Sequence, residues 1–161
     1  MKCVKNKKKQ KNCCVGFMKF SQKKNKMSSS DIQFTMTTYK SLGGFESGLV
    51  KFIKSNVIIE SNTLEHARHG IMTIAIHHFL YSSPADFDQS NWLGNPSSFY
   101  AAALGGRHRT CVDQNGEFGM CYFADGSAIE EWSPFRGASS DVELANKLCN
   151  WLGIPVRLSR Q

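Results

Sequence analysis

Two short turn signals, Asn115-Gly116 and Asp125-Gly126, constrain the fold of this chain more than any other feature. Asn-Gly and Asp-Gly favour tight β-hairpins, because both central residues of a type I′ turn need a positive φ angle. The first turn joins RHRTCVDQ to EFGMCYF, and the second joins that segment to SAIEEW. The sequence therefore predicts a three-stranded meander with strands at about 107–114, 117–123 and 128–132.

Two-residue turns would also fix which residues face each other across the meander. Val112 would face Gly119, and Gly119 would face Trp132, so that the indole lies over a glycine that leaves room for it. Cys111 and Cys121 would lie on opposite faces, because side chains alternate along a strand. This arrangement disfavours a disulfide between them, and a β-bulge would reverse the expectation.

Residues 62–81 predict a helix, because Asn62 and Glu65 form a start similar to a capping box and apolar residues follow at helical spacing. The segment contains four histidines, at positions 66, 69, 77 and 78. On one helix the first and third of these lie about 16 Å apart, which is too far to share a metal ion. Since the sequence also lacks an H-E-x-x-H arrangement, we predict no metal site and no cofactor.

The C-terminal segment predicts a second helix at 141–152. Ser140 and Glu143 resemble a capping box, an apolar stripe follows, and Gly153 ends the helix. A short amphipathic helix needs an apolar surface to pack on, most simply the sheet. The expected fold class is therefore α+β: a small antiparallel β-meander (about 107–132) packed with flanking helices (about 62–81 and 141–152) and preceded by a disordered basic tail.

The signals between the tail and the first helix are weaker. Residues 27–61 begin rich in Ser and Thr and contain a double glycine, which is typical of a linker with weak elements. They predict one short strand at 32–38 and a brief strand at 57–60. Between these, residues 45–53 show helical spacing interrupted by Gly48.

Positive charge is concentrated at the N-terminus. Ten of the 20 Lys and Arg residues are lysines within residues 1–26, which contain no acidic residue. The remaining ten basic and 13 acidic residues give the rest of the chain a net charge of −3, although the whole chain carries +7. A lysine run with few aromatics predicts a disordered tail with at most weak contact to anionic membranes or nucleic acid.

No segment has the length of a targeting or membrane-spanning element. The longest apolar runs, at 13–18 and 71–76, are far shorter than a membrane helix of about 20 residues. The first of them is also shorter than the apolar region of an export signal, about 7–15 residues. We therefore expect no transmembrane segment and, without a recognisable export signal, a cytoplasmic location by default.

These signals divide the chain into five segments. They are a lysine-rich tail at 1–26, a linker at 27–61, a helix and loop at 62–90, a small domain at 91–139, and a C-terminal helix and tail at 140–161.

Residues 95–137 carry an ordered set of short motifs: NPSSFY at 95–100, a double glycine at 105–106 and GEFGMCYFADGSAIEEWSPFRG at 116–137. In that order they resemble a small bacterial domain of unknown function to which a haemolysin label is attached. The resemblance implies no established reaction, cofactor or catalytic residues. The matching positions are Asn95, Pro96, Ser98, Tyr100, Gly105, Gly106, Gly119, Cys121, Phe123, Asp125, Gly126, Ser127, Glu130, Glu131, Trp132, Phe135, Arg136 and Gly137.

The chain departs from the resembled family in its cysteines. The family is usually exported and carries further cysteines at positions that here hold Ala101, Ile129 and Ser139. Of the usual set, Cys121 remains. This departure fits a reducing compartment, or a diverged or decaying copy of the domain. The haemolysin label implies membrane damage, but residues 91–139 contain no long apolar or amphipathic segment that would insert into a bilayer.

We expect a non-enzymatic binding or interaction module whose partner is an unknown protein or small molecule. Its candidate surface is the EEWSPFRG corner, where Glu131 and Arg136 are close enough in sequence to pair. Packing and turn chemistry also account for Trp132 and Phe135, which makes a structural role the stronger expectation for each of the four residues. The remaining motif positions are expected to be structural: Asn95, Pro96, Tyr100, Gly105, Gly106, Gly119, Asp125, Gly126 and Gly137.

Two alternatives remain open. The first is a membrane-associated, haemolysin-like protein that uses the basic tail and the 62–81 helix. The second is an enzyme in which Cys111 or Cys121 acts with His108, and it lacks a third residue to orient the histidine. The adjacent acids Glu130 and Glu131 would point to opposite faces of a strand and cannot act as a carboxylate pair. We therefore expect no enzymatic activity.

Overall fold

The computed structural model describes residues 15–16 and 32–156. The predicted basic tail at 1–26 lies outside the described residues, except for a two-residue strand, β1 (Val15–Gly16), which pairs with β2. Both helices and strands are present, so the α+β class is confirmed.

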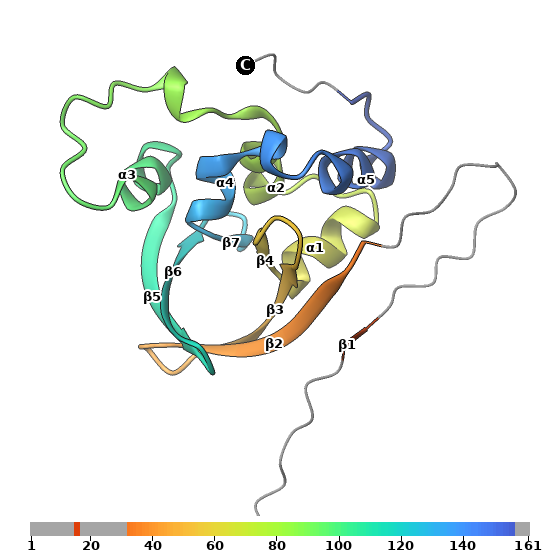
Figure 1. The fold of residues 1–161 in the computed structure, drawn as a ribbon, viewed down its shortest axis with the longest axis horizontal. Coiled ribbons are helices and arrows are strands. Elements are labelled where there is room, and N and C mark those ends of the chain that lie inside the picture. Colours follow the sequence, from red (N-terminus) through yellow and green to blue (C-terminus); the bar gives the residue numbers. More distant parts are fainter. Residues whose placement is uncertain (1–14, 17–31, 157–161) are drawn as a thin grey trace, which may run out of the picture.

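Six antiparallel strands close into a barrel, seen as a ring in Figure 1. Their order is β2-β3-β4-β7-β6-β5, and β5 pairs back with β2. The predicted meander is present as β5, β6 and β7, but it is half of the barrel and not a separate small sheet. The strands are β2 (Phe34–Ser41), β3 (Glu46–Phe52), β4 (Ile58–Glu60), β5 (Arg107–Asp113), β6 (Gly116–Tyr122) and β7 (Ala128–Glu130).

The segment expected to be a linker supplies the other half of the barrel. The two predicted strands are present as β2 and β4, but the helical spacing at 45–53 is misleading, because this segment forms β3. Leu49 faces the barrel interior, whereas Val50 and Phe52 face the helices. Apolar residues on both faces of one strand do not alternate, so the pattern does not show the period of two.

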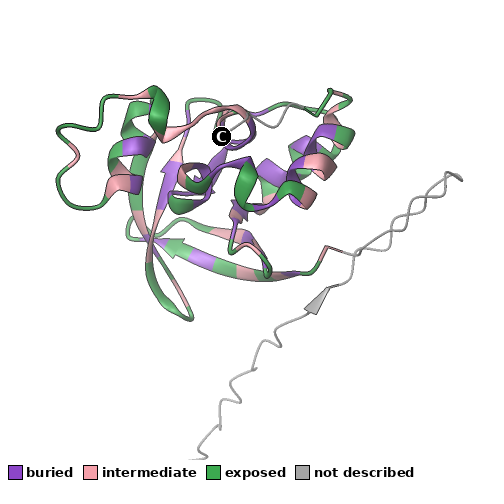
Figure 2. Ribbon diagram, turned by 45° about the horizontal axis from the view of Figure 1, so that its top comes forward, coloured by how far each residue is buried: buried purple, intermediate pink, exposed green. Residues whose placement is uncertain are grey.

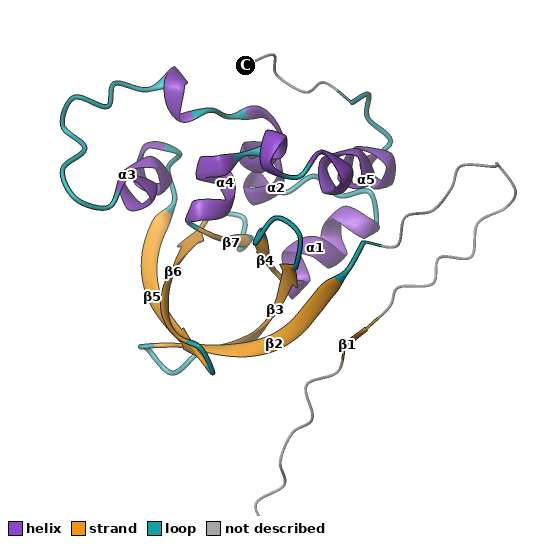
Figure 3. Ribbon diagram, viewed as in Figure 1, coloured by secondary structure: helices purple, strands orange, loops and turns teal. Residues whose placement is uncertain are grey.

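The five α-helices of the described residues lie on one side of the barrel (Figures 1 and 3). α1 contacts β3 and β4, α3 contacts β5 and β6, and α4 contacts β7. The helices are α1 (Ser61–Arg68), α2 (Ile74–Tyr81), α3 (Pro96–Ala103), α4 (Trp132–Arg136) and α5 (Val142–Leu152), with short 3₁₀ turns at Pro84–Asp86 and Ala138–Ser140.

The helix predicted at 62–81 is two helices, α1 and α2. α1 is capped by the side chain of Glu60, which accepts a hydrogen bond from the Thr63 N–H, and not by Asn62. Gly70 then takes a left-handed φ of 77°, and the Thr73 side chain caps α2. Such a left-handed glycine is a common helix end, and it lets the two short helices pack on the core in different directions.

The helix predicted at 141–152 is confirmed as α5, and Gly153 ends it with a left-handed φ of 65°. Its cap is Asp141, whose Oδ1 accepts a hydrogen bond from the Leu144 N–H at 2.9 Å. Ser140 was the expected cap, but its hydroxyl donates to the Gly137 carbonyl instead.

The protein has two apolar cores. The larger lies between the helices and the outer face of the barrel, where buried residues gather in Figure 2. The smaller fills the barrel interior and consists of Tyr39, Leu49, Cys111, Met120 and Ala128. Cys111 belongs to the interior core and Cys121 to the outer core, which confirms that they face opposite sides of the sheet. Both thiols are free.

Candidate functional site

The two hairpins differ from the expected register. On the first, Thr110 and not Val112 is opposite Gly119, because Gln114 and Asn115 are the central turn residues. Asp113 stabilises this turn by accepting a hydrogen bond from the Asn115 N–H at 2.7 Å. The prediction used Asn115-Gly116 as the turn centre, which shifts the pairing by two residues.

The second hairpin is shifted by one residue, so Trp132 does not lie opposite Gly119. Cys121 pairs with Ile129, and the Glu131 N–H donates to the Gly119 carbonyl at 3.1 Å. Trp132 instead begins α4 and is 38 % exposed. The side chain over Gly119 is therefore a carboxylate and not an indole. A Cβ added at Gly119 would collide with Oε2 of Glu131.

Glu131 is a buried carboxylate with a partner on each oxygen. The residue is 1 % exposed. Its Oε1 lies 2.5 Å from Nδ1 of His108 on β5, and its Oε2 accepts a hydrogen bond from Ser98 on α3 at 2.8 Å. A buried charge is tolerated when it is paired and hydrogen-bonded in this way. Through these hydrogen bonds Glu131 connects α3 and β5 to the end of β7.

His108 is oriented by this carboxylate. Its side chain is 47 % exposed, and its Nε2 lies 3.3 Å from the Thr110 hydroxyl. A carboxylate oxygen of Glu131 accepts a hydrogen bond from the Nδ1–H of His108, and in this tautomer of the neutral imidazole Nε2 is the acceptor for the Thr110 hydroxyl. Ser98, Glu131, His108 and Thr110 thus form one hydrogen-bonded chain along the outer face of the barrel.

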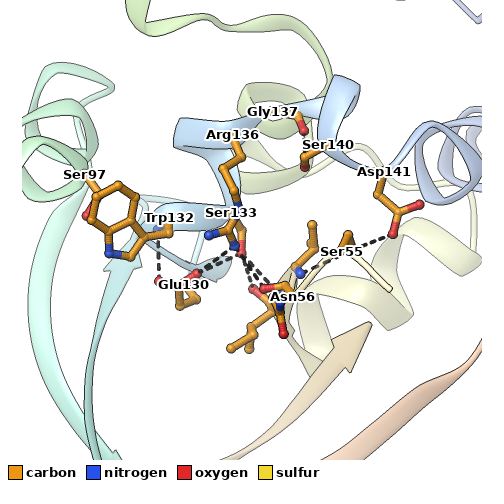
Figure 4. Close-up of polar contacts among 12 residues, drawn as sticks. Ser55, Asn56, Ser97, Glu130, Trp132, Ser133, Arg136, Gly137, Ser140 and Asp141 are labelled. Carbon is orange, nitrogen blue, oxygen red and sulfur yellow. Dashed lines mark hydrogen bonds and ion pairs between the residues drawn. The ribbon is translucent and has the colours of Figure 1, made fainter. Parts of the chain in front are cut away.

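Glu130 points to the other face of the strand, toward the barrel interior, and forms an acidic corner with Ser133 and Arg136 (Figure 4). Its oxygens accept hydrogen bonds from the Trp132 N–H at 2.9 Å and the Ser133 hydroxyl at 3.0 Å. Nη2 of Arg136 lies 3.9 Å from Oε2 of Glu130. Burial raises the pKa of Glu130 despite these hydrogen bonds. The predicted Glu131–Arg136 pair is therefore wrong, because Arg136 pairs with Glu130.

The acidic corner also holds the loop between β3 and β4. Arg136 donates to the Asn56 carbonyl at 3.0 Å, and the Ile58 N–H donates to the Ser133 hydroxyl at 2.9 Å. Asn56 has a left-handed φ of 57°. Such a backbone is uncommon outside glycine, although asparagine tolerates it better than most residues. On the other side of the loop, Ser55 donates to Asp141 at 2.5 Å.

This loop borders a hollow of about 350 Å³ at one end of the barrel, here called the barrel mouth. The seam between β2 and β5 explains its position, because their pairing is limited to Lys40–Val112 and Ser41–Cys111. Beyond those pairs the two strands separate. The barrel mouth is lined by Thr35, Thr37, Leu49, Lys51, Ile53, Asn56, Ile58, Asp113, Gln114 and Asn115.

Sequence reasoning missed the barrel mouth because most of its residues lie in the expected linker. One signal was available in β2. Thr35, Thr37, Tyr39 and Ser41 recur every second residue, and the structure places Thr35 and Thr37 in the mouth, on the strand face that carries Tyr39. Recognising that period of two would have indicated a strand with a polar inner face.

The positions expected to be structural lie mainly at the ends of elements. Asn95 caps α3, and Pro96 is its first residue. The side chain of Asp125 accepts hydrogen bonds from Ser127 and from the Ile74 N–H. Tyr100 is fully buried, and its ring packs edge-on against Phe135. The glycines at 105, 126 and 137 have positive φ angles, and Gly106 lies against Cys121 and Ala101.

The thiols named in the enzyme hypothesis are both buried. Burial raises the pKa of Cys121 to about 12 and also raises the pKa of Cys111. Reactive cysteines need a lowered pKa and access to substrate. Neither thiol has that setting, and Nδ1 of His108 is bound to Glu131.

Within residues 15–16 and 32–156, no group of three or more His, Cys, Asp or Glu side chains is placed to hold a metal ion. In the same part of the chain, no helix has the length and apolar character needed to span a bilayer.

Comparison with known proteins gives one finding. Comparisons with curated proteins and with solved structures give no match for the chain. The model of a family described as a domain of unknown function, DUF333, matches residues 93–138. The matched segment includes α3, β5, β6, β7, α4 and the acidic corner, whereas β2, β3 and β4 lie outside it. The second half of the barrel is thus the part of this chain that is similar to a domain of unknown function, DUF333.

Proposed function

We propose that the chain is a non-enzymatic binding module that holds a small molecule in the barrel mouth. The observation that carries this proposal is the hollow of about 350 Å³, whose walls come from both halves of the barrel. Ligand pockets typically measure about 300–1,000 Å³, and the mouths of β-barrels are frequent ligand sites. The lining combines three aliphatic side chains with hydroxyl, amide and charged groups, as small-molecule sites do.

The acidic corner of Glu130, Ser133 and Arg136 supports this function because it holds one wall of the barrel mouth in place. Arg136 and Ser133 hold the loop that carries Asn56, and Glu130 binds both of them. A rim that is fixed before the ligand arrives loses little conformational entropy on binding. Glu130, Ser133 and Arg136 are therefore positioning residues, and the matched family segment contributes to the site by holding its wall in place.

Two substitutions on adjacent residues of β2 test the proposal. Thr37 lines the barrel mouth, whereas its neighbour Thr38 is exposed on the outer face. In two-dimensional amide NMR with small-fragment mixtures, saturable shifts should gather at Thr35, Thr37 and Asn115. Thr37→Trp should fill the mouth and abolish these shifts, whereas Thr38→Trp should leave them unchanged. Fragments that shift other surfaces, or equal responses of the two variants, would contradict the proposal.

The membrane alternative gains no support from the 62–81 segment. Within α2, the side chains of Ala75, Ile76, Phe79 and Leu80 are buried in the core of the protein. A helix in this position has no free apolar face to insert into a bilayer without unfolding its surroundings. A membrane role, and with it the haemolysin label, would depend on the basic tail. Dye release from anionic vesicles by the full chain would favour that alternative.

A further inference from the structure

We propose that the ligand of the barrel mouth is a small monocarboxylate with an apolar body, and that Lys51 binds its carboxylate. This inference rests on the proposed function, because it names the class of molecule that the same hollow accepts. It follows from those charged and hydrogen-bonding groups of the lining that have no partner among the described residues.

Lys51 is the cation of the barrel mouth. It lies on β3 between Leu49 and Ile53, which also line the hollow, and it is half-buried. Among the described residues, no hydrogen bond or ion pair involves its ammonium group. By contrast, Lys40 pairs with Glu46 and Lys54 with Glu143, each at 3.8 Å. A half-buried lysine whose ammonium has no partner among the described residues favours a ligand that supplies a negative charge.

The carboxylate of the barrel mouth is already hydrogen-bonded. Asp113 accepts hydrogen bonds from the Asn115 N–H at 2.7 Å and from the Asn115 side-chain amide at 3.3 Å. These hydrogen bonds belong to the β5–β6 turn, so a ligand ammonium would have to compete with them. No ion pair joins Asp113 to Lys51 in the described part of the chain. The charge of the lining that has no partner among the described residues is therefore the positive charge of Lys51.

The neutral groups of the barrel mouth complete the description of the ligand. The hydroxyls of Thr35 and Thr37 form no hydrogen bond with a described residue and are free to donate to a carboxylate oxygen. Leu49 on the neighbouring strand β3, Ile53 just after it and Ile58 on β4 give the lining an aliphatic wall. A carboxylate near Lys51 with a hydrocarbon chain along this wall would satisfy both kinds of surface.

The experiment compares three ligands of equal chain length: octanoate, octan-1-ol and octylamine. Each is titrated into the full chain at pH 7 and followed by amide NMR, so that the affinity and the site are obtained together. Octanoate should bind at the barrel mouth about tenfold or more tighter than octan-1-ol, because it adds a charge-assisted hydrogen bond. Octylamine should bind most weakly.

Two matched variants test the role of Lys51. Lys51→Gln should lower the affinity for octanoate about tenfold and leave that for octan-1-ol unchanged. Lys40→Gln removes the same charge on the outer face of β2 and should leave both affinities unchanged. Thermal unfolding of both variants checks that the fold is intact.

The outcomes separate this inference from the proposed function. If octan-1-ol or octylamine binds at the mouth as tightly as octanoate, or if Lys51→Gln has no effect, the carboxylate assignment is overturned while the binding module stands. If none of the three ligands shifts residues of the mouth, the carboxylate assignment also fails. If, in addition, the fragment mixtures give no shifts there, the proposed function fails with it.

Discussion

The two halves of the barrel are both three-stranded antiparallel meanders, but they differ in their similarity to known proteins. The half formed by β5, β6 and β7 lies within the segment that matches DUF333 and follows the chain through two tight turns. The half formed by β2, β3 and β4 lies outside that match. The halves join where β5 meets β2 and where Ile59 of β4 meets Ile129 of β7. Short local connections thus join the strands within each half, whereas closing the ring depends on pairs far apart in the chain.

Neither half buries its inner face alone. Cys111 and Met120 are fully buried in the interior core, and their neighbours there include Tyr39 and Leu49 from the other half. An isolated sheet of three strands would leave this face in water. The segment that matches DUF333 is therefore part of a larger folding unit in this chain.

The largest expected effect comes from separating the halves. A fragment of residues 91–139 should remain unfolded at 25 °C, because it loses the strands that cover Cys111 and Met120 as well as helices α1, α2 and α5. Circular dichroism and amide NMR would show the difference from the full chain. A cooperative thermal transition of the fragment would refute the claim that the halves depend on each other.

The next largest effect is expected at Gly119, because the buried carboxylate of Glu131 lies directly over it. Gly119→Ala should lower the free energy of unfolding by about 1–3 kcal/mol, because the added Cβ collides with Oε2 of Glu131 and forces buried groups apart. Gly43→Ala is the control, since its Cβ would meet the Ser41 hydroxyl oxygen at an ordinary 3.7 Å. Urea unfolding measures both changes. Equal values for the two variants would show that Glu131 does not occupy the space above Gly119.

How far the sequence anticipates the fold also differs between the halves. The Asn-Gly and Asp-Gly signals at 115–116 and 125–126 identify β5, β6 and β7 because they act over a few residues. β3 is hidden because both of its faces are buried, so Leu49 and Val50 do not alternate with polar residues. The ring itself depends on β2 meeting β5, and no local signal reports a pair separated by about 70 residues.

The residues predicted for a binding surface do not line the barrel mouth, and their pairing differs from the prediction. Glu131 and Arg136 were named, but Arg136 pairs with Glu130 and Glu131 binds His108. A one-residue change in register is enough to exchange the two glutamates between faces of the strand, and turn chemistry alone does not determine the register that closely. Lys51 and Asn56 were missed because their segment was expected to be a linker.

A smaller effect is expected at the contact that links the two halves behind the barrel mouth. Arg136→Ala should cost about 1–2 kcal/mol, because it removes the hydrogen bond to the Asn56 carbonyl and leaves Glu130 without its positive neighbour. Arg68→Ala removes an exposed i,i+3 pair with Glu65 and should cost at most about 0.5 kcal/mol. A larger loss for Arg68→Ala in chemical denaturation would contradict this account of the corner.

The smallest effect is a pH dependence that originates at Glu130. Burial raises its folded-state pKa above the ordinary 4.5, so the group stabilises the fold below pH 4.5 and this contribution is lost as the pH rises through the raised value. Glu130→Gln should remove that slope, which is at most about 1.4 kcal/mol per pH unit. Urea unfolding from pH 4 to 8 would reveal it. If the unfolding free energy of Glu130→Gln depends on pH as that of the unmodified chain does, a group other than Glu130 causes the slope.

The central claim is that one closed barrel joins the two halves, and the seam between β2 and β5 tests it most directly. Nuclear Overhauser contacts between backbone protons of Ser41 and Cys111, and of Lys40 and Val112, are expected if the ring is closed. Slow hydrogen exchange at the seam should accompany them, because paired amides are protected. If these contacts are absent and the free edge of β5 exchanges rapidly, the barrel is open and the account of its mouth is wrong.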